Sequence, residues 1–202
     1  MKQSPYVRDS LYYTCHITNT TSYTMLLVEH LAKQHAQITP LFKTAIEIAA
    51  LWHDIGKQFL PEDILSSPNK LTEDEFTLIK THTTLGKEYI DTLSLDIDEQ
   101  TYQILSDVIL YHHEKFDGSG YPMGIAANEI PFSAKIVALA DVFESLTSKR
   151  SYKPAFSFEK AKHIIVEEKG SHFDPVVVEA FLSIQEQFKA HLKSLNCSQC
   201  AA

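Results

Sequence analysis

Apolar residues recur with the spacing of an α-helix along nearly all of this 202-residue chain. No segment alternates apolar and polar residues over a convincing length, so the sequence predicts an all-α fold. The predicted helices lie at about 8–35, 40–55, 72–93, 98–113, 133–148, 158–168 and 174–194. Gly and Pro gather between them, above all in the stretch EKFDGSGYPMGIAANEIP that begins at Glu114. A connection of this length is uncommon in a compact domain and is usually functional.

Histidines and aspartates stand where apolar helix faces would continue. In the second predicted helix, the stripe that contains Ile46 and Ala50 passes directly onto His53 and Asp54. The fourth predicted helix ends in the same way, and three others carry one such group each. Five helices therefore direct polar side chains at the core. The residues are His16, His53, Asp54, His82, His112, His113 and Asp141.

Burying such groups costs several kcal/mol each unless they are paired or bind an ion. Any one of them alone is better explained by a backbone carbonyl or a helix cap. All seven together are explained most simply by metal, because imidazole nitrogens and carboxylate oxygens are ligands of Fe, Mn, Zn and Ni. Seven groups exceed what one ion binds, and Asp54 can offer one oxygen to each of two ions. Paired ions are a recurrent arrangement for phosphoester hydrolysis.

Longer strings surround these positions. They are AALWHDIGKQFLPEDIL (49–65), LTEDEF…IKTHTTLG (71–86), HHEKFDGSGYP (112–122), IPFSAKIVALADVFESLTSKRSYKPAFS (130–157) and HFDP (172–175). With the H…HD…D pattern of His16, His53-Asp54 and Asp141, they resemble the HD-GYP subfamily of the HD phosphohydrolase superfamily over about residues 10–185. HDIGK together with HHExxDGxGYP at this separation is highly specific. The resemblance implies an HD-domain bundle of about seven helices with a long GYP loop.

The resemblance also implies a cyclic-di-GMP phosphodiesterase with a non-haem centre of two divalent ions, iron first and manganese as the alternative. One ion would be held by His16, His53, Asp54 and Asp141. The other would be held by Asp54, His82, His112 and His113. A hydroxide that bridges the ions would attack phosphorus in line with the departing 3′ oxygen. The main product expected is linear pGpG, which is cut slowly onward to GMP.

Three basic residues are candidates for phosphate binding. Lys57 follows the HD pair closely, and either Lys57 or a metal-bound water would protonate the leaving group, so Asp54 and Lys57 are the predicted catalytic residues. For Arg150 and Lys153 the resemblance implies phosphate contacts. Tyr121 would line the nucleotide pocket or bind a partner, with packing of the loop against the core as a nearly equal alternative.

The GYP loop needs sharp turns, which Gly118 and Gly124 allow. Glu114 and Asp117 are predicted to support the metal ligands or to cap the loop, and a solvated Glu114 is an equal alternative. In some relatives a Glu four residues before the first His serves a third ion. That position is Tyr12 here, and a phenol is a poor substitute for a carboxylate at neutral pH. Two ions are therefore predicted.

Net charge is −8, which argues against a nucleic-acid polymer as partner, because its binders neutralise phosphates with clustered Lys and Arg. No apolar run reaches about 18 residues and the start lacks a secretory pattern, so a cytoplasmic protein without a membrane segment is expected. Cys15 and the CxxC of Cys197 and Cys200 are interpreted as reduced thiols.

A single domain is predicted over 1–202, with its core at about 10–185 and a helix end with a mobile tail at 186–202. No receiver or PAS segment is recognised, so regulation would come from another chain, or the sequence is a fragment. Two other functions stay open. One is hydrolysis of another phosphoester, such as a hybrid cyclic dinucleotide. The other is a nucleotide sensor that contacts signalling proteins through the GYP loop.

Overall fold

The computed structural model describes residues 11–67, 69–149 and 154–199, and these form helices and no strand. The all-α prediction is confirmed. The α-helices are α1 (Leu11–Leu31), α2 (Pro40–Trp52), α3 (Glu62–Leu65), α4 (Glu73–Lys80), α5 (His82–Thr92), α6 (Glu99–Tyr111), α7 (Phe132–Thr147), α8 (Phe158–Glu167), α9 (Pro175–Ser183) and α10 (Gln185–Gln199). Short 3-10 helices are η1 (Ile55–Phe59) and η2 (Ala127–Glu129). None of the helices in the described ranges is long and apolar enough to cross a membrane.

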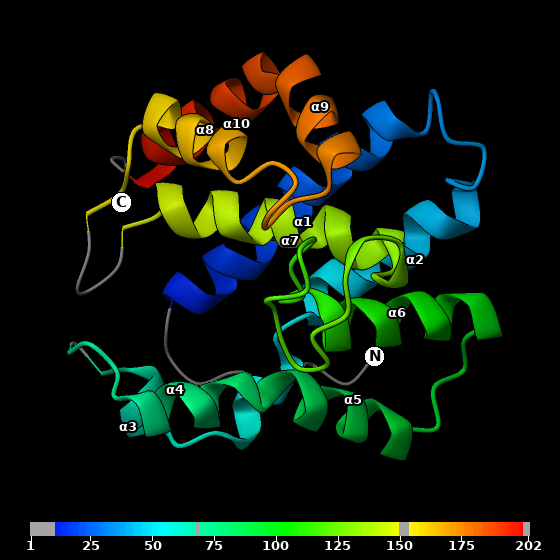
Figure 1. Ribbon diagram of the computed structural model, residues 1–202, viewed down its shortest axis with the longest axis vertical. Coiled ribbons are helices and arrows are strands. Elements are labelled where there is room, and N and C mark those ends of the chain that lie inside the picture. The colour runs from blue at the N-terminus through cyan, green and yellow to red at the C-terminus, as the bar shows by residue number, and fades with distance from the viewer. Residues whose placement is uncertain (1–10, 68, 150–153, 200–202) are drawn as a thin grey trace.

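The helices are stacked in layers around α7 (Figure 1). Helices α8, α9 and α10 cover one side of α7, and α6 packs on it from the other side. Helix α1 packs against both α2 and α7, and α2 packs against α6. Helices α4 and α5 form the outer layer beyond α6, where α5 contacts α6 and η1. The parts of the helices that carry the predicted metal ligands therefore meet in the interior, between these layers.

An aromatic cluster fixes α1 on α7. The side chains of Tyr23, Phe143, Phe181 and Phe188 are fully buried. The ring centroid of Tyr23 lies 4.8 Å from those of both Phe143 and Phe188. Full burial of one such side chain contributes about 1.5–3 kcal/mol. Because α1 and α7 carry predicted ligands, this packing sets the distance between those ligands.

Polar caps start several helices where the sequence has a Thr, Asp or Ser. The Thr39 hydroxyl accepts a hydrogen bond from the backbone N–H of Phe42 at the start of α2, and Pro40 follows it. Asp98 and Asp174 cap α6 and α9 in the same way. Each cap satisfies a backbone donor that has no partner within its helix.

Two of the predicted helices are each divided into two helices in the structure. The segment 72–93 forms α4 and α5 with a break at Thr81, and 174–194 forms α9 and α10 with a break at Ile184. At the first break, the hydroxyl of Thr81 donates to the carbonyl of Leu78, and Nδ1 of His82 lies 2.7 Å from the carbonyl of Ile79. Side chains that bond these carbonyls compete with the helical ladder. Helix α10 also continues to Gln199, beyond the predicted end at 194.

Candidate metal centre

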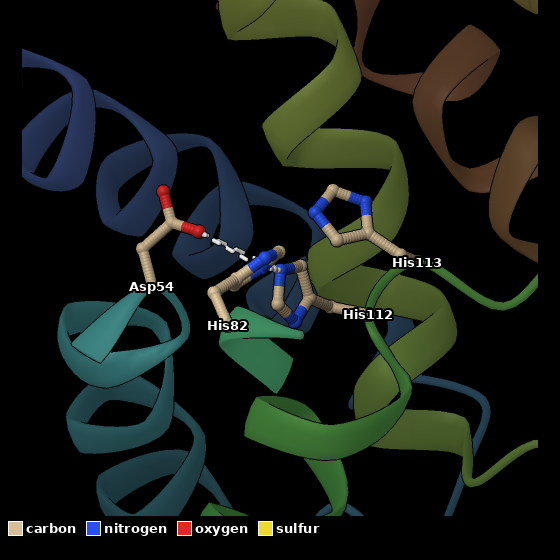
Figure 2. A group of neighbouring side chains, drawn as sticks. All are labelled: Asp54, His82, His112 and His113. Carbon is tan, nitrogen blue, oxygen red and sulfur yellow. Dashed lines mark hydrogen bonds and ion pairs between the residues drawn. The ribbon is translucent and has the colours of Figure 1, made fainter. Parts of the chain in front are cut away.

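The structure brings the seven predicted ligands together in two adjoining groups. The first contains His16, His53 and Asp141, and the second contains Asp54, His82, His112 and His113. Within each group the ligand atoms lie within 4.8 Å of one another. Figure 2 shows the side chains of the second group pointing at a common point. Of the seven side chains, six are buried and that of His113 is half-buried.

Asp54 lies between the two groups and turns one oxygen to each. Its Oδ2 lies 3.6 Å from Nε2 of His16 and 3.5 Å from Nε2 of His53. Its Oδ1 lies 3.3 Å from Nε2 of His82 and 3.8 Å from Nε2 of His112. This is the arrangement that a carboxylate needs in order to bridge two ions.

Five of the seven predicted ligands come from positions where helices end or begin, and His16 and Asp141 lie inside α1 and α7. His53 and His112 are the C-terminal caps of α2 and α6, and His82 is the first residue of α5. At Asp54 the backbone turns from α2 into η1. A Cβ atom added to Gly56 would lie 1.8 Å from the carbonyl oxygen of His82, so η1 and α5 are in direct backbone contact. Glycine at this position allows the HDIGK turn to bring Asp54 close to His82.

The hydrogen bonds of three histidines fix which ring nitrogen faces the centre. Nδ1 of His53, His82 and His112 lies 2.7, 2.7 and 2.9 Å from the carbonyl oxygens of Ala50, Ile79 and Val108, respectively. A carbonyl oxygen only accepts, so each Nδ1 carries a proton, and in the tautomer that binds metal Nε2 presents a lone pair toward the centre.

These lone pairs fit divalent ions. Nε2 of His82 and Nε2 of His112 lie 3.4 Å apart, and Nε2 of His53 is buried with no hydrogen-bond partner in the described residues. Two lone pairs that face each other in a buried site repel unless a cation lies between them. Imidazole nitrogens with carboxylate oxygens form a donor set that suits Fe, Mn or Zn. The residues present therefore fit the metal centre that the sequence predicted.

Burial keeps the histidines of the second group in the neutral form, in which an imidazole can bind a metal. It lowers the pKa of His82 to about 4 and the pKa of His112 to about 3. Burial and the neighbouring His112 also hold the pKa of His113 well below its usual range. Burial alone would raise the pKa of Asp54, but the charge of Lys57 and nearby histidines outweigh it and hold this pKa well below its usual range. At neutral pH this group therefore presents lone pairs and an ionised carboxylate.

His16 has a partner that the sequence reasoning missed. Its Nδ1 donates to Oε2 of Glu144 at 2.5 Å, and its Nε2 lies 3.2 Å from Oδ1 of Asp141. Burial would lower the pKa of His16, but hydrogen bonds with Asp141, Asp54 and Glu144 hold it well above its usual range. Glu144 follows Val137 by seven residues on the buried face of α7. The rule that singled out Asp141 would have identified Glu144 as well.

The residues predicted to contact substrate lie at different places. Nζ of Lys57 lies 2.5 Å from Oδ2 of Asp54, at the edge of the centre. The ring of Tyr121 stacks on the ring of His113, with centroids 4.7 Å apart and planes at 28°. Lys80, which was not predicted, places its ammonium 5.6 Å from the centroid of the same tyrosine. Arg150 and Lys153 lie outside the described residues, as does the side chain of Tyr12.

Glu114 caps the GYP loop. Its Oε1 accepts hydrogen bonds from the backbone N–H groups of Met123 and Gly124, at 2.6 and 3.0 Å. The side chain is buried, so the alternative of a solvated glutamate was wrong. Asp117 also serves the loop, because its Oδ1 accepts from the backbone N–H of Ser119. Gly124 has a φ of +65°, which agrees with its predicted role in a sharp turn.

Comparison with known proteins adds independent information. A family model described as HD domain matches residues 10–177. A cyclic di-GMP phosphodiesterase of Vibrio cholerae serotype O1 is 42% identical over 179 residues, which cover 87% of this chain and 36% of that protein. The 3′3′-cGAMP-specific phosphodiesterase 2 of the same organism is 37% identical over 150 residues, which cover 74% of this chain and 28% of that protein. The chain thus spans well under half the length of these relatives.

A solved structure shares the fold. The crystal structure of a cyclic GMP-AMP specific phosphodiesterase of V. cholerae matches with a TM-score of 0.63, at 20% sequence identity. The match covers 91% of this chain and 47% of that chain. At this level of identity the likeness concerns the arrangement of helices alone.

Proposed function

This chain belongs to the HD domain family, with the motifs of its HD-GYP subfamily, and from that premise we propose that it is a metal-dependent phosphodiesterase for a cyclic dinucleotide. The substrate proposed is cyclic-di-GMP. The observation that carries the proposal is the position of Asp54 between two groups of buried ligands, with one oxygen toward each. Two ions are proposed, iron in the first place and manganese as the alternative.

Bound divalent ions would lower the pKa of a water molecule and neutralise the charge of the phosphoryl oxygens. The protein's own part is to hold the ligands and to place the substrate. Asp54 sets the spacing between the two groups. Lys57, which lies against Asp54, is proposed to move to the phosphate and to protonate the departing 3′ oxygen. A movable ammonium can serve one partner in the free enzyme and another in the substrate complex.

Tyr121 is proposed to support the site through its ring. It stacks on His113 and is half-buried, so it limits the rotation of this imidazole and excludes water from one side of it. Burial also raises the pKa of the Tyr121 phenol, which keeps it neutral. Phosphate contacts of Arg150 and Lys153, and signalling partners at the GYP loop, stay predictions.

The product proposed is mainly pGpG. Tyr12 stands at the position where some relatives have a glutamate that serves a third ion, so two ions are proposed here rather than three. A second substrate is favoured by one observation, the 37% identity with a 3′3′-cGAMP-specific phosphodiesterase. Hydrolysis of this hybrid dinucleotide is therefore the alternative activity. A sensor without turnover is the alternative outside the enzymes.

One experiment separates these functions. Protein loaded anaerobically with Fe(II) or Mn(II) is incubated with cyclic-di-GMP and with 3′3′-cGAMP, and the products are identified by chromatography. We expect faster turnover of cyclic-di-GMP, with pGpG accumulating before GMP. Asp54→Ala should lose both metal and turnover, whereas Asp63→Ala, which removes an exposed carboxylate in α3, should retain both. Binding without cleavage by fully loaded protein, or full activity of Asp54→Ala, would show the proposal wrong.

A further inference from the structure

The histidines of the metal centre differ in what holds their second ring nitrogen. For His53, His82 and His112 the partner of Nδ1 is a backbone carbonyl three or four residues earlier. For His16 the partner is the carboxylate of Glu144 on another helix. A difference of this kind calls for a physical reason.

The reason lies in the position of each histidine along its helix. The last four carbonyls of a helix have no partner within the helix, so they are available to side chains. His53 and His112 follow the ends of α2 and α6, and His82 follows the end of α4, so each finds such a carbonyl. His16 stands inside α1, and no free helix end lies beside it. Its Nδ1 is held by a carboxylate of a neighbouring helix instead.

Glu144 meets this need from α7. The side chain is 1% exposed, and it lies one turn after Asp141 on the helix that packs against α1. Its second oxygen, Oε1, accepts a hydrogen bond from the hydroxyl of Ser148. Both carboxylate oxygens are therefore engaged, and the one that faces His16 is fixed. Helix α7 therefore supplies both Asp141, a predicted ligand, and Glu144, which supports the neighbouring ligand His16.

We propose that Glu144 is a positioning residue that fixes the ring of His16 and strengthens its hold on the ion of the His16, His53 and Asp141 group. This inference rests on the proposed metal-dependent function. A carboxylate on Nδ1 orients the imidazole as a carbonyl does, and its negative charge also makes Nε2 a stronger donor to a metal. Loss of such a partner typically weakens metal binding about 10–100-fold. The loss should fall mainly on one ion, because the Glu144 carboxylate bonds His16, a ligand of that ion alone.

The test measures metal binding apart from activity. Wild type, Glu144→Ala and Glu144→Gln are dialysed anaerobically against graded Mn(II), and bound metal is quantified by mass spectrometry. We expect Glu144→Ala to retain one ion with wild-type affinity and to bind the other at least about 10-fold more weakly. Glu144→Gln keeps an oxygen that accepts from Nδ1, so its loss should be smaller. Glu159→Gln, the same change at an exposed position, should match wild type.

A double-variant comparison shows whether Glu144 acts through His16. If it does, Glu144→Gln added to His16→Ala should weaken metal binding no further than His16→Ala alone. Additive losses would overturn the proposal, and so would wild-type affinity for both ions in Glu144→Ala. If Glu144→Ala does not fold, equal loss of both ions in folded Glu144→Gln would overturn it as well. A protein that binds two ions but cleaves no dinucleotide would refute the proposed function and leave this test intact.

Discussion

Replacing Gly56 with alanine should separate the HDIGK turn from the ligand His82. A Cβ atom at this position would lie 1.8 Å from the carbonyl oxygen of His82 and 2.6 Å from the backbone nitrogen of Gly86. Real Cβ atoms essentially never approach closer than 3.0 Å. The closest contact must therefore lengthen by about 1.2 Å, the difference between 3.0 and 1.8 Å. Both opposing atoms belong to the backbone of α5, so no side chain can rotate to make room.

The structure sets the size of the effect. Overpacking of a well-packed core typically costs about 1–3 kcal/mol. Gly56→Ala should lie near the top of this range, since backbone must move, and about 3 kcal/mol would lower the Tm of a chain of this size by roughly 6–12 °C. The same movement takes His82 away from Asp54. Ligand geometry tolerates errors of about 0.5 Å, so affinity for the ion at His82 should fall at least about 10-fold.

Urea unfolding with and without a chelator separates the two effects. When a chelator has removed the metal, the difference in the free energy of unfolding between Gly56→Ala and wild type reports only the packing cost. Without chelator, the metal content, measured by mass spectrometry, reports the ligand geometry. Gly86→Ala serves as the comparison, because its closest contact, the Cγ2 atom of Ile109 at 2.8 Å, is less severe than that of Gly56, and its closest backbone contact, the nitrogen of Gly56, lies at 3.2 Å. We expect a smaller loss of stability and little loss of metal there. If Gly56→Ala unfolds within about 0.5 kcal/mol of wild type and keeps both ions, the reasoning is refuted.

Two further predictions concern the histidines. In metal-free protein, the pKa values of about 4 for His82 and about 3 for His112 lie below the unfolded value of 6.5, so the unfolded state gains protons first as the pH falls. The free energy of unfolding should decrease from about pH 6.5 toward pH 4, by up to about 1.4 kcal/mol per pH unit for each of these two residues. His16 has a raised pKa, so its contribution to stability is lost only as the pH rises above 6.5. Urea unfolding that became harder on acidification would contradict this prediction. Tyr121→Phe should keep metal content and KM because the ring still stacks on His113, whereas Tyr121→Ala should lose about 0.5–1.5 kcal/mol of ring contact, up to about a tenfold change. Equal losses in both variants, measured by dialysis and steady-state kinetics, would show that the hydroxyl group matters instead.

The meeting of the seven proposed ligands in the interior could be predicted because a polar side chain on an apolar helix face has a physical cost that the sequence displays. His53 and Asp54 continue the stripe of Ile46 and Ala50, and the structure places them in the interior as that cost requires. Glu144 follows the same rule, but the H…HD…D pattern names only Asp141 on this helix, so Glu144 was passed over. The rule is therefore more general than the motif.

Other features depend on contacts that no spacing encodes. The break at Thr81 lies within a continuous helical pattern, and it arises from side chains that take backbone carbonyls. The role of Glu114 could not be chosen from the sequence, because its partners, the N–H groups of Met123 and Gly124, return to it only through the fold of the loop. The contact of Lys57 with Asp54 is likewise a property of the folded turn.

Asp54 joins two parts of the fold, and this position connects stability with metal binding. On one side of its carboxylate lies His16 from α1, and on the other lies His82 from α5 in the outer layer. An ion in either group would tie helices of different layers together, so its binding free energy would add to the free energy of unfolding. Without ions, the core holds polar histidines and aspartates whose burial costs free energy. A core selected for stability alone would carry apolar side chains at these positions.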